Sequence, residues 1–365
     1  MKRNSSIEIL RILSIIAILA LHYALQSGSE SFGYVDFSLN SVFIQSISMF
    51  GRLACTIFAL ITGYYMIQSE TNYTKIISKD FELLFKLIIY SYFLIIVNAI
   101  FHFASLSGGE LIKAGVPFVF ENWYIKYYLL FSLLVPYLNI GLKKLNELQY
   151  RKLVVIILLL WSVIPTLTIN TISSGELDFF IAVYIIGGYI RLHVDLDRIN
   201  STKLKVFMLT SIVALIGSVL FFDCLGIILK SDALIAKATW FKNYNSILAV
   251  CCAISVFIYF LRKRFYVGAI NNISKTALGI YILSDSIVVR NYIWNVVSPN
   301  ENYVDNPYLH AAIKILVVFV LCMLIDLAYD GTLGKVVKRI SESLTNRIVR
   351  SVRPKLMKNR SEVDD

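Results

Sequence analysis

Long apolar stretches separated by short polar connections run through almost the whole chain. Apolar runs of roughly 20 residues match the thickness of the hydrocarbon core of a bilayer, so each run predicts a transmembrane helix. Ten runs meet this description, at 7–26, 42–67, 82–104, 118–140, 152–170, 178–193, 204–222, 244–262, 274–293 and 310–329. The pattern therefore predicts an all-α polytopic membrane protein with about ten transmembrane helices.

Basic residues mark one side of this predicted bundle. Lys and Arg gather in alternate connections, and such loops normally remain in the cytoplasm. The basic connections contain residues 75–79, 143–152, 191–205 and 262–275, whereas the other connections carry only Lys113, Lys230, Lys237 and Lys242. This asymmetry predicts that both termini are cytoplasmic. The prediction depends on the sixth run crossing the membrane, and that run is short and contains Gly187 and Gly188.

The chain is predicted to form one membrane domain, residues 1–330, followed by a basic cytoplasmic tail, residues 331–365. The tail alternates apolar and basic residues before Pro354, which is typical either of a helix on the anionic inner leaflet or of a solvated tail. The predicted outer segment 223–243 mixes apolar and charged residues, as an interfacial helix or a lid would. No small-residue cleavage site follows the first apolar run, so we expect it to be retained.

Composition supports a membrane location. Of the 365 residues, 57% are hydrophobic and 16% are charged, whereas soluble proteins carry about 25% charged residues. The net charge of +11 does not indicate a nucleic-acid partner, because the basic residues lie in loops and in the tail, where they orient the chain against membrane lipid. The five cysteines have neither metal-binding nor redox spacing, so no metal site is predicted.

The first apolar run contains three ionisable residues, Glu8, Arg11 and His22. Eleven positions turn a helix about three times, which places Arg11 and His22 on one face at a rise of roughly 16 Å. Ionisable residues inside a bilayer usually face the bundle interior or a wet cavity. Glu8 and Arg11 alone would also fit helix-end anchors, whereas His22 lies deep in the run. The face therefore predicts a functional site.

Two further runs place polar groups inside the membrane. Arg52 lies in the outer half of the second run, where it would either form an ion pair or hold an anionic group. The fourth run begins with Glu121, Trp123 and Tyr124. The two aromatic residues also fit an ordinary interfacial belt. Glu121 is expected to have a cationic partner, such as Arg52 or Lys126.

The ninth run contains Tyr281 and Asp285, four residues apart and therefore on one helix face. Arg290 is expected to extend to the outer boundary of the membrane. Four more ionisable residues lie close to predicted helix ends and are interpreted as anchors: Lys86, His102, Lys314 and Asp326.

These residues give the chain a resemblance to the acyltransferase-3 family of bacterial integral membrane O-acyltransferases. The family's first helix has an acidic residue and then Arg, ten residues and His, which here are Glu8, Arg11 and His22. Other family motifs resemble Gly51-Arg52 and Thr62-Gly63-Tyr64 in the second run, Trp123, Tyr124 and Pro136 in the fourth, and the segment from Gly279 to Asp285 in the ninth. The resemblance covers nearly the full length. Ser284 and Asp285 replace the family's His and Pro, and Thr62 replaces its Ser.

The resemblance implies a multi-pass protein of the bacterial inner or plasma membrane that transfers an acyl group, commonly acetyl, from cytoplasmic acyl-CoA to a glycan. The acceptor would be a hydroxyl of a surface polysaccharide or lipid-linked sugar, with no bound cofactor. We expect His22 to act as general base; an acyl-enzyme relay through His22 is the alternative. Arg11 with Lys75 and Lys79 is expected to bind the CoA phosphates, and Glu8 either orients Arg11 or forms a hydrogen bond elsewhere. The expected acceptor-binding residues are Arg52, Glu121, Trp123, Tyr124, Tyr281 and Asp285.

Three other classes also fit a bundle with buried polar groups. A transporter or flippase would use such groups for coupled passage, but we find no duplicated halves, which many transporters show. A glycan polymerase is less favoured because the predicted outer loops are short apart from residues 223–243. A non-enzymatic membrane anchor is the third alternative. Binding of acyl-CoA would separate an acyltransferase from all three.

Overall fold

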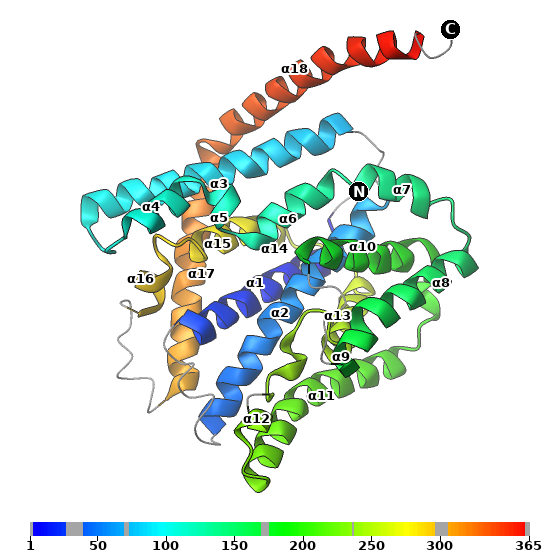
Figure 1. Ribbon diagram of the computed structural model, residues 1–365, viewed down its shortest axis with the longest axis vertical. Coiled ribbons are helices and arrows are strands. Elements are labelled where there is room, and N and C mark those ends of the chain that lie inside the picture. Colours follow the sequence, from blue (N-terminus) through cyan, green and yellow to red (C-terminus); the bar gives the residue numbers. More distant parts are fainter. Residues whose placement is uncertain are drawn as a thin grey trace.

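The computed structural model describes residues 3–26, 39–68, 73–168, 175–235, 237–295 and 306–361. Within these ranges every regular element is helical, and the helices form one bundle from which the C-terminal helix extends (Figure 1). The prediction of an all-α protein is therefore confirmed.

Seven described helices are long and apolar enough to cross a membrane. They are α1 (Ser5–Gln26), α2 (Leu39–Met66), α3 (Tyr73–Phe101), the α8–α9 segment (Glu147–Thr168), α11 (Ser201–Ile228), the α12–α13 segment (Asp232–Leu261) and α17 (Pro307–Gly331). An eighth would be the pair α6 (Trp123–Ser132) and α7 (Val135–Leu142), which meet at 55°. The bend directly precedes Pro136, which lies in the first turn of α7, where a proline starts a helix but cannot continue the one before it. The count of ten and the orientation of the termini stay predictions.

The other two predicted spans take different forms in the structure. The sixth corresponds to α10 (Glu176–His193), which is largely buried but carries the charged residues Glu176, Asp178 and Arg191. The ninth is broken rather than continuous, because α15 (Ala277–Ser284) ends at Ser284 and α16 (Arg290–Asn295) begins after a turn. Ser and Asp favour local side-chain bonds over helix continuation, and Ser284, Asp285 and Ser286 lie at this break. The outer segment 223–243 also divides, into the end of α11, the short α12 (Asp232–Ile235) and a turn at Trp240–Lys242.

Helix α1 lies in the middle of the bundle and contacts α2, α13 (Ile247–Leu261), α14 (Gly268–Ile273), α15, α16 and α17. Small residues allow the closest approaches. A Cβ atom on Gly51 would lie 2.8 Å from the Ala17 carbonyl oxygen of α1, and one on Gly63 would lie 2.8 Å from the Tyr184 carbonyl oxygen of α10. Because lipid provides no hydrophobic drive between helices, such close backbone contact is a main source of helix association.

The N-terminus of α1 is fixed by polar bonds to α14 and to the connection between α13 and α14. The Ser5 amide donates to the Phe265 carbonyl at 2.9 Å, and the Ser5 hydroxyl donates to Asn271 Oδ1 at 2.9 Å. The first residues of α1 therefore lie beside the basic loop that contains Lys263. The sequence predicts that the start of the first helix and this basic loop lie on the same side of the membrane, and their contact is consistent with that prediction.

Two of the four residues interpreted as anchors, Lys314 and Asp326, are instead buried inside the bundle, and the side chain of a third, Lys86, is only 14% exposed. Lys86 Nζ lies 2.6 Å from Asp326 Oδ1, and the Tyr90 hydroxyl donates to the same carboxylate oxygen. Asp326 is fully buried. Lys314 is also buried and donates to the Trp294 carbonyl. The anchor interpretation was wrong for these residues because a partner far away in the chain cannot be seen in one hydrophobicity pattern. Only the fourth, His102, is exposed, just beyond the end of α3.

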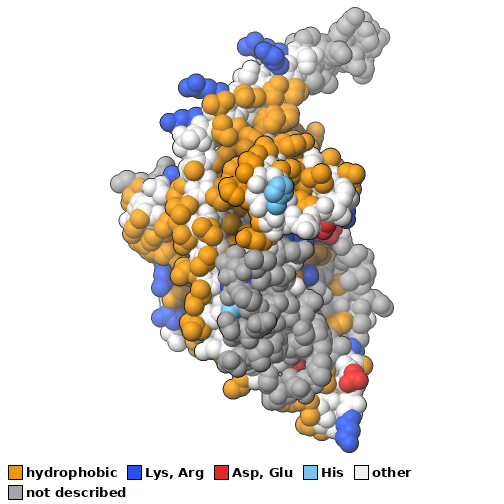
Figure 2. Space-filling view, turned by 90° about the vertical axis from the view of Figure 1, so that its left-hand side faces the viewer, with side chains coloured by type: hydrophobic (Ala, Val, Ile, Leu, Met, Phe, Trp, Pro, Cys, Tyr) orange, Lys and Arg blue, Asp and Glu red, His pale blue; other side chains and the backbone are white. Residues whose placement is uncertain are grey.

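The basic tail forms α18 (Gly334–Ser361), which packs along the first half of α3 and then leaves the bundle (Figure 1). Ser341 and Thr345 are buried, whereas Val336 and Ile340 are about half exposed. Basic side chains lie along one edge of this helix and hydrophobic side chains along the other in Figure 2. The predicted helical pattern is confirmed, and the lipid contact and the domain boundary stay predictions.

Candidate functional site

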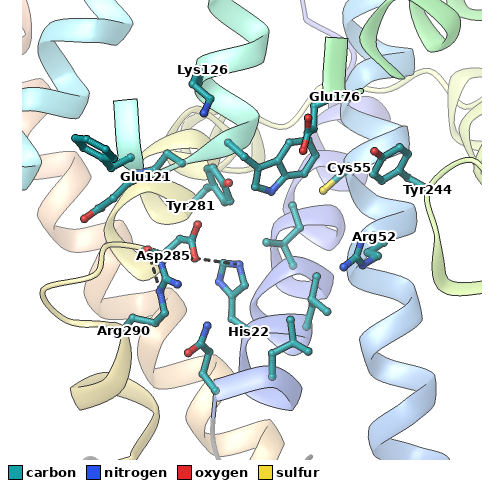
Figure 3. A pocket seen from close by; sticks show the side chains of 17 residues that line it. His22, Arg52, Cys55, Glu121, Lys126, Glu176, Tyr244, Tyr281, Asp285 and Arg290 are labelled. Carbon is teal, nitrogen blue, oxygen red and sulfur yellow. Dashed lines mark hydrogen bonds and ion pairs between the residues drawn. The ribbon is translucent and has the colours of Figure 1, made fainter. Parts of the chain in front are cut away.

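A cavity of about 500 Å³ opens beside the second half of α1, and we call it the His22 cavity. Its walls come from α1, α2, α6, the first residue of α10, the residues before α13, and the end of α15 (Figure 3). Six of the ionisable residues that the sequence analysis placed in the predicted runs line this cavity: His22, Arg52, Glu121, Lys126, Asp285 and Arg290. The polar and aromatic side chains that give the cavity its chemistry include His22, Arg52, Glu121, Trp123, Tyr281 and Asp285.

His22 extends from α1 toward the broken end of α15. Its side chain is only 10% exposed, and Nε2 lies 3.8 Å from Oδ1 of Asp285, whose side chain is 15% exposed. The second ring nitrogen, Nδ1, is buried and has no hydrogen-bond partner in the described part of the chain. A neutral imidazole has one donor and one acceptor nitrogen. The ring thus has one nitrogen directed to a carboxylate and a second, buried nitrogen without a partner among the residues that the structure describes.

Asp285 is held in place by Arg290, as Figure 3 shows. The Arg290 guanidinium donates to the Asp285 carbonyl oxygen from Nε at 3.3 Å and from a terminal nitrogen at 2.8 Å, and it lies 3.6 Å from the Asp285 carboxylate. The turn after Ser284 makes this possible, because it folds Arg290 back toward the end of α15. The expectation that Arg290 extends to the membrane boundary stays a prediction.

Tyr281 lies one helical turn before Asp285 and lines the same cavity, as their shared face predicts. Its ring centroid lies 6.2 Å from that of His22. Tyr124 packs behind it, edge to face, at 6.1 Å. Tyr124 therefore supports the cavity wall and is not itself part of the lining.

The side of the cavity opposite Asp285 is aromatic and cationic. Trp123 stacks with Tyr244, with ring centroids 6.2 Å apart and planes inclined by 21°. Arg52 also lines this side (Figure 3). Its guanidinium forms neither a hydrogen bond nor a salt bridge with any residue that the structure describes, although it lies close enough to Cys55 and Tyr244 to influence them electrostatically. The cavity thus contains a cation that is free to bind an anionic or polar group.

Glu121 is buried at the edge of the cavity, but it has no salt bridge with the cations predicted for it. One carboxylate oxygen accepts a hydrogen bond from the Ile287 amide at 3.4 Å. Lys126 instead donates to the Val119 carbonyl at 3.5 Å. The predicted pairing with Arg52 or Lys126 was therefore wrong, because the broken end of α15 supplies a backbone donor that an unbroken helix would not offer.

Glu8 and Arg11 lie near the other end of α1, outside the His22 cavity. Glu8 is buried and accepts a hydrogen bond from the Ser274 hydroxyl at 2.6 Å, and Arg11 lies 3.6 Å from the same oxygen. Lys75 and Lys79 lie in the first turns of α3 and do not line the cavity. The structure therefore separates Glu8 and Arg11, near the start of α1, from the predicted site residues around His22.

Several residues that complete the cavity were not predicted to belong to a site. Arg290 and Lys126 were noted without an assigned role there, and Glu176 and Tyr244 were not considered. Glu176 starts α10, and Tyr244 lies just before α13, so both resemble ordinary boundary residues in the sequence. Among the described residues, no cluster of three or more His, Cys, Asp or Glu side chains is placed to hold a metal ion.

Comparison with known proteins agrees with the family resemblance of the sequence motifs. The family described as "Acyltransferase domain" matches residues 4–327, which is nearly the whole chain. No curated protein and no solved structure matched the chain. The match includes every residue of the His22 cavity and of the group around Arg11. The chain therefore belongs to the acyltransferase-3 family of membrane acyltransferases.

Proposed function

We propose that the protein is a bacterial inner-membrane O-acyltransferase that moves an acyl group, most simply acetyl, from cytoplasmic acyl-CoA to a hydroxyl of a surface polysaccharide or lipid-linked glycan. His22 is the general base of this reaction. The observation that carries the proposal is a buried imidazole that faces a 500 Å³ cavity with one ring nitrogen free of partners among the described residues.

The chemistry requires such a base. A sugar hydroxyl is a weak nucleophile, and His22 would take its proton as the oxygen attacks the thioester carbonyl carbon. The tetrahedral intermediate then loses the thiolate of CoA as the carbon–sulfur bond breaks, and the protonated imidazole returns the proton to that sulfur. General-base assistance of this kind contributes roughly 10² to 10⁴ in rate.

The lining of the His22 cavity suits a polyhydroxylated acceptor. The stacked pair Trp123 and Tyr244 offers an aromatic face to the apolar side of a sugar ring. Glu121 lines the cavity, and its carboxylate can accept a hydrogen bond from a hydroxyl. Arg52 can donate to a ring substituent. These contacts would hold an acceptor hydroxyl close to His22.

The donor is proposed to bind near the other end of α1. Arg11 is about 30% exposed, and the first turns of α3 carry Lys75 and Lys79. Cationic side chains on the predicted cytoplasmic side can hold the phosphates of CoA by charge-assisted hydrogen bonds. Glu8 orients Arg11 in this proposal, since the Glu8 carboxylate is itself fixed by Ser274.

The test uses the full-length protein in lipid nanodiscs, with acetyl-CoA and the lipid-linked glycans extracted from the host membrane. We expect release of free CoA and a new ester on the glycan by NMR with the natural sequence. His22→Ala should reduce this transfer by roughly 10²-fold or more, whereas His102→Ala, at an exposed position beyond α3, should leave it unchanged. Absence of acetyl-CoA-dependent ester formation by the natural sequence would overturn the proposal, and full activity of His22→Ala would remove His22 from it.

A further inference from the structure

We infer that Asp285, held by Arg290, is the positioning residue that orients the His22 ring for proton transfer. The inference rests on the proposed function and deepens it, because it assigns a role to a position where this chain departs from the family pattern. The sequence predicts that Asp285 binds the acceptor. The geometry gives it a different task.

The two nitrogens of the His22 ring have different surroundings. One lies 3.8 Å from Asp285 Oδ1, and the other has no protein partner in the described ranges. A carboxylate beside Nε2 favours the tautomer with the proton on Nε2, which leaves Nδ1 as the acceptor. Catalytic contacts are often long before substrate binds and shorten in the reacting complex. Nδ1 is then the acceptor nitrogen; it is buried in the structure, so its contact with the hydroxyl has to form in the reacting complex, where it receives the proton.

The charge that develops during the reaction also requires Asp285. When His22 takes the proton it becomes an imidazolium inside a site whose side chains are 10% and 15% exposed. A buried cation without a partner is costly, and among the described residues the Asp285 carboxylate is the acidic group that forms an ion pair with this ring. A carboxylate that orients and stabilises the imidazolium, without itself taking the proton, is the arrangement found in triads of hydrolytic enzymes.

Asp285 is itself fixed. Arg290 binds its backbone carbonyl by two hydrogen bonds and lies 3.6 Å from its carboxylate. A side chain used only to bind an acceptor would not need its backbone held. The family motif has Pro at this position, and Pro has no carboxylate. The pairing of a carboxylate with His22 at this position is therefore a property of this chain. The break in the ninth helix and the Arg290 bonds together direct the carboxylate at His22 rather than away from it.

The main experiment compares Asp285→Asn with the natural sequence in the nanodisc assay. Asn keeps the shape and leaves the Arg290 bonds to the backbone carbonyl intact, so the fold and the KM for acceptor should change little. We expect kcat to fall roughly 10²- to 10⁴-fold, as for an orienting carboxylate in a triad, and Asp285→Glu to recover part of the loss. His22→Ala with Asp285→Asn should be no slower than His22→Ala alone, because residues that act as one unit are non-additive.

A second measurement determines the tautomer of the His22 ring directly by NMR. Protein labelled with ¹⁵N in histidine should show His22 as a single tautomer protonated on Nε2, assigned by its loss in His22→Ala. Asp285→Asn should convert this signal to a mixture of tautomers. If Asp285 only supported the fold or bound the acceptor, Asp285→Asn would leave the His22 tautomer unchanged.

The outcomes separate this inference from the proposed function. If the natural sequence forms no ester, the proposed function fails. If it forms ester and His22→Ala abolishes this, but Asp285→Asn keeps kcat or raises only the acceptor KM, the proposed function stands and the positioning role is overturned. An unchanged tautomer in Asp285→Asn would overturn it as well.

Discussion

The buried ion pair between Lys86 and Asp326 predicts a large and selective loss of stability when one partner is removed. Lys86 extends from α3, and its nitrogen lies 2.6 Å from the carboxylate of Asp326 in α17. Asp326 is fully buried and lies directly against the backbone of α15 at Gly279, where any Cβ atom would overlap its carboxyl group. The pair therefore connects α3 and α17 next to the helix that carries Asp285. The substitution that tests this connection is Lys86→Met.

The size of the expected loss follows from burial. Removing one partner of a buried pair leaves an uncompensated charge and costs about 3–5 kcal/mol of unfolding free energy. The side chains of this pair are 14% and 0% exposed. Tyr90 still donates to the carboxylate after the substitution, which places the expected loss near the lower end, about 3 kcal/mol. Lys86→Met combined with Asp326→Asn removes both charges and should lose clearly less than Lys86→Met alone.

The control is a pair with similar geometry on the surface. Arg198 lies 2.9 Å from Asp195, but their side chains are 88% and 54% exposed. Exposed pairs contribute about 0–1 kcal/mol, so Arg198→Met should change stability little. The measurement is the free energy of unfolding in mixed micelles, titrated with a denaturing detergent and followed by tryptophan fluorescence. A loss for Lys86→Met as small as that for Arg198→Met, or a double variant as unstable as the single one, would show that the buried charge is not what costs stability.

Two further predictions use the same protein preparations. Gly63→Ala should lower the unfolding free energy by about 1–3 kcal/mol, as expected for overpacking, because its new Cβ atom would lie 2.8 Å from the backbone oxygen of Tyr184. Gly141→Ala, which meets no atom within 4 Å, is the matched control, and equal effects of the two substitutions would contradict the prediction. Arg11→Ala should raise the KM for acetyl-CoA about tenfold, the loss of roughly one charge-assisted hydrogen bond, and leave the acceptor KM unchanged; an unchanged dependence of rate on acetyl-CoA concentration would exclude Arg11 from donor binding.

Much of the helical architecture could be predicted from the sequence, because the thickness of a bilayer fixes the length of an apolar run. The seven long helices all fall on predicted runs. The break in the ninth run was not predicted, although Ser284, Asp285 and Ser286 form a polar interruption in an otherwise apolar segment. Three polar residues change the average hydrophobicity of a run of 20 residues only slightly. The length and the average hydrophobicity of the ninth run therefore do not reveal the break. The local chemistry of Ser and Asp, which compete with backbone bonding, was the available signal.

The pairing of charges could not be predicted from the sequence. Helical periodicity places residues on one face of their own helix, but it does not say which other helix covers that face. Lys86 and Asp326 lie far apart in the chain, and each alone resembles a helix-end anchor. Glu121 was expected to pair with a cation, yet it accepts a bond from a backbone amide released by the break in α15. Both differences arise from contacts between distant segments.

The separation of Arg11 from His22 constrains how the proposed reaction can proceed. Their eleven-residue spacing gives a rise of roughly 16 Å along α1, and the structure places His22 in the cavity but leaves Arg11 outside it. A donor whose phosphates bind at Arg11 must therefore reach along α1 to bring its thioester to His22. Tyr124 and Tyr281 meet edge to face at 6.1 Å at the wall of the His22 cavity. In the proposed function, donor and acceptor would approach His22 from opposite ends of the same helix, and a cytoplasmic thioester would then acylate a sugar on the other side without either molecule crossing the membrane.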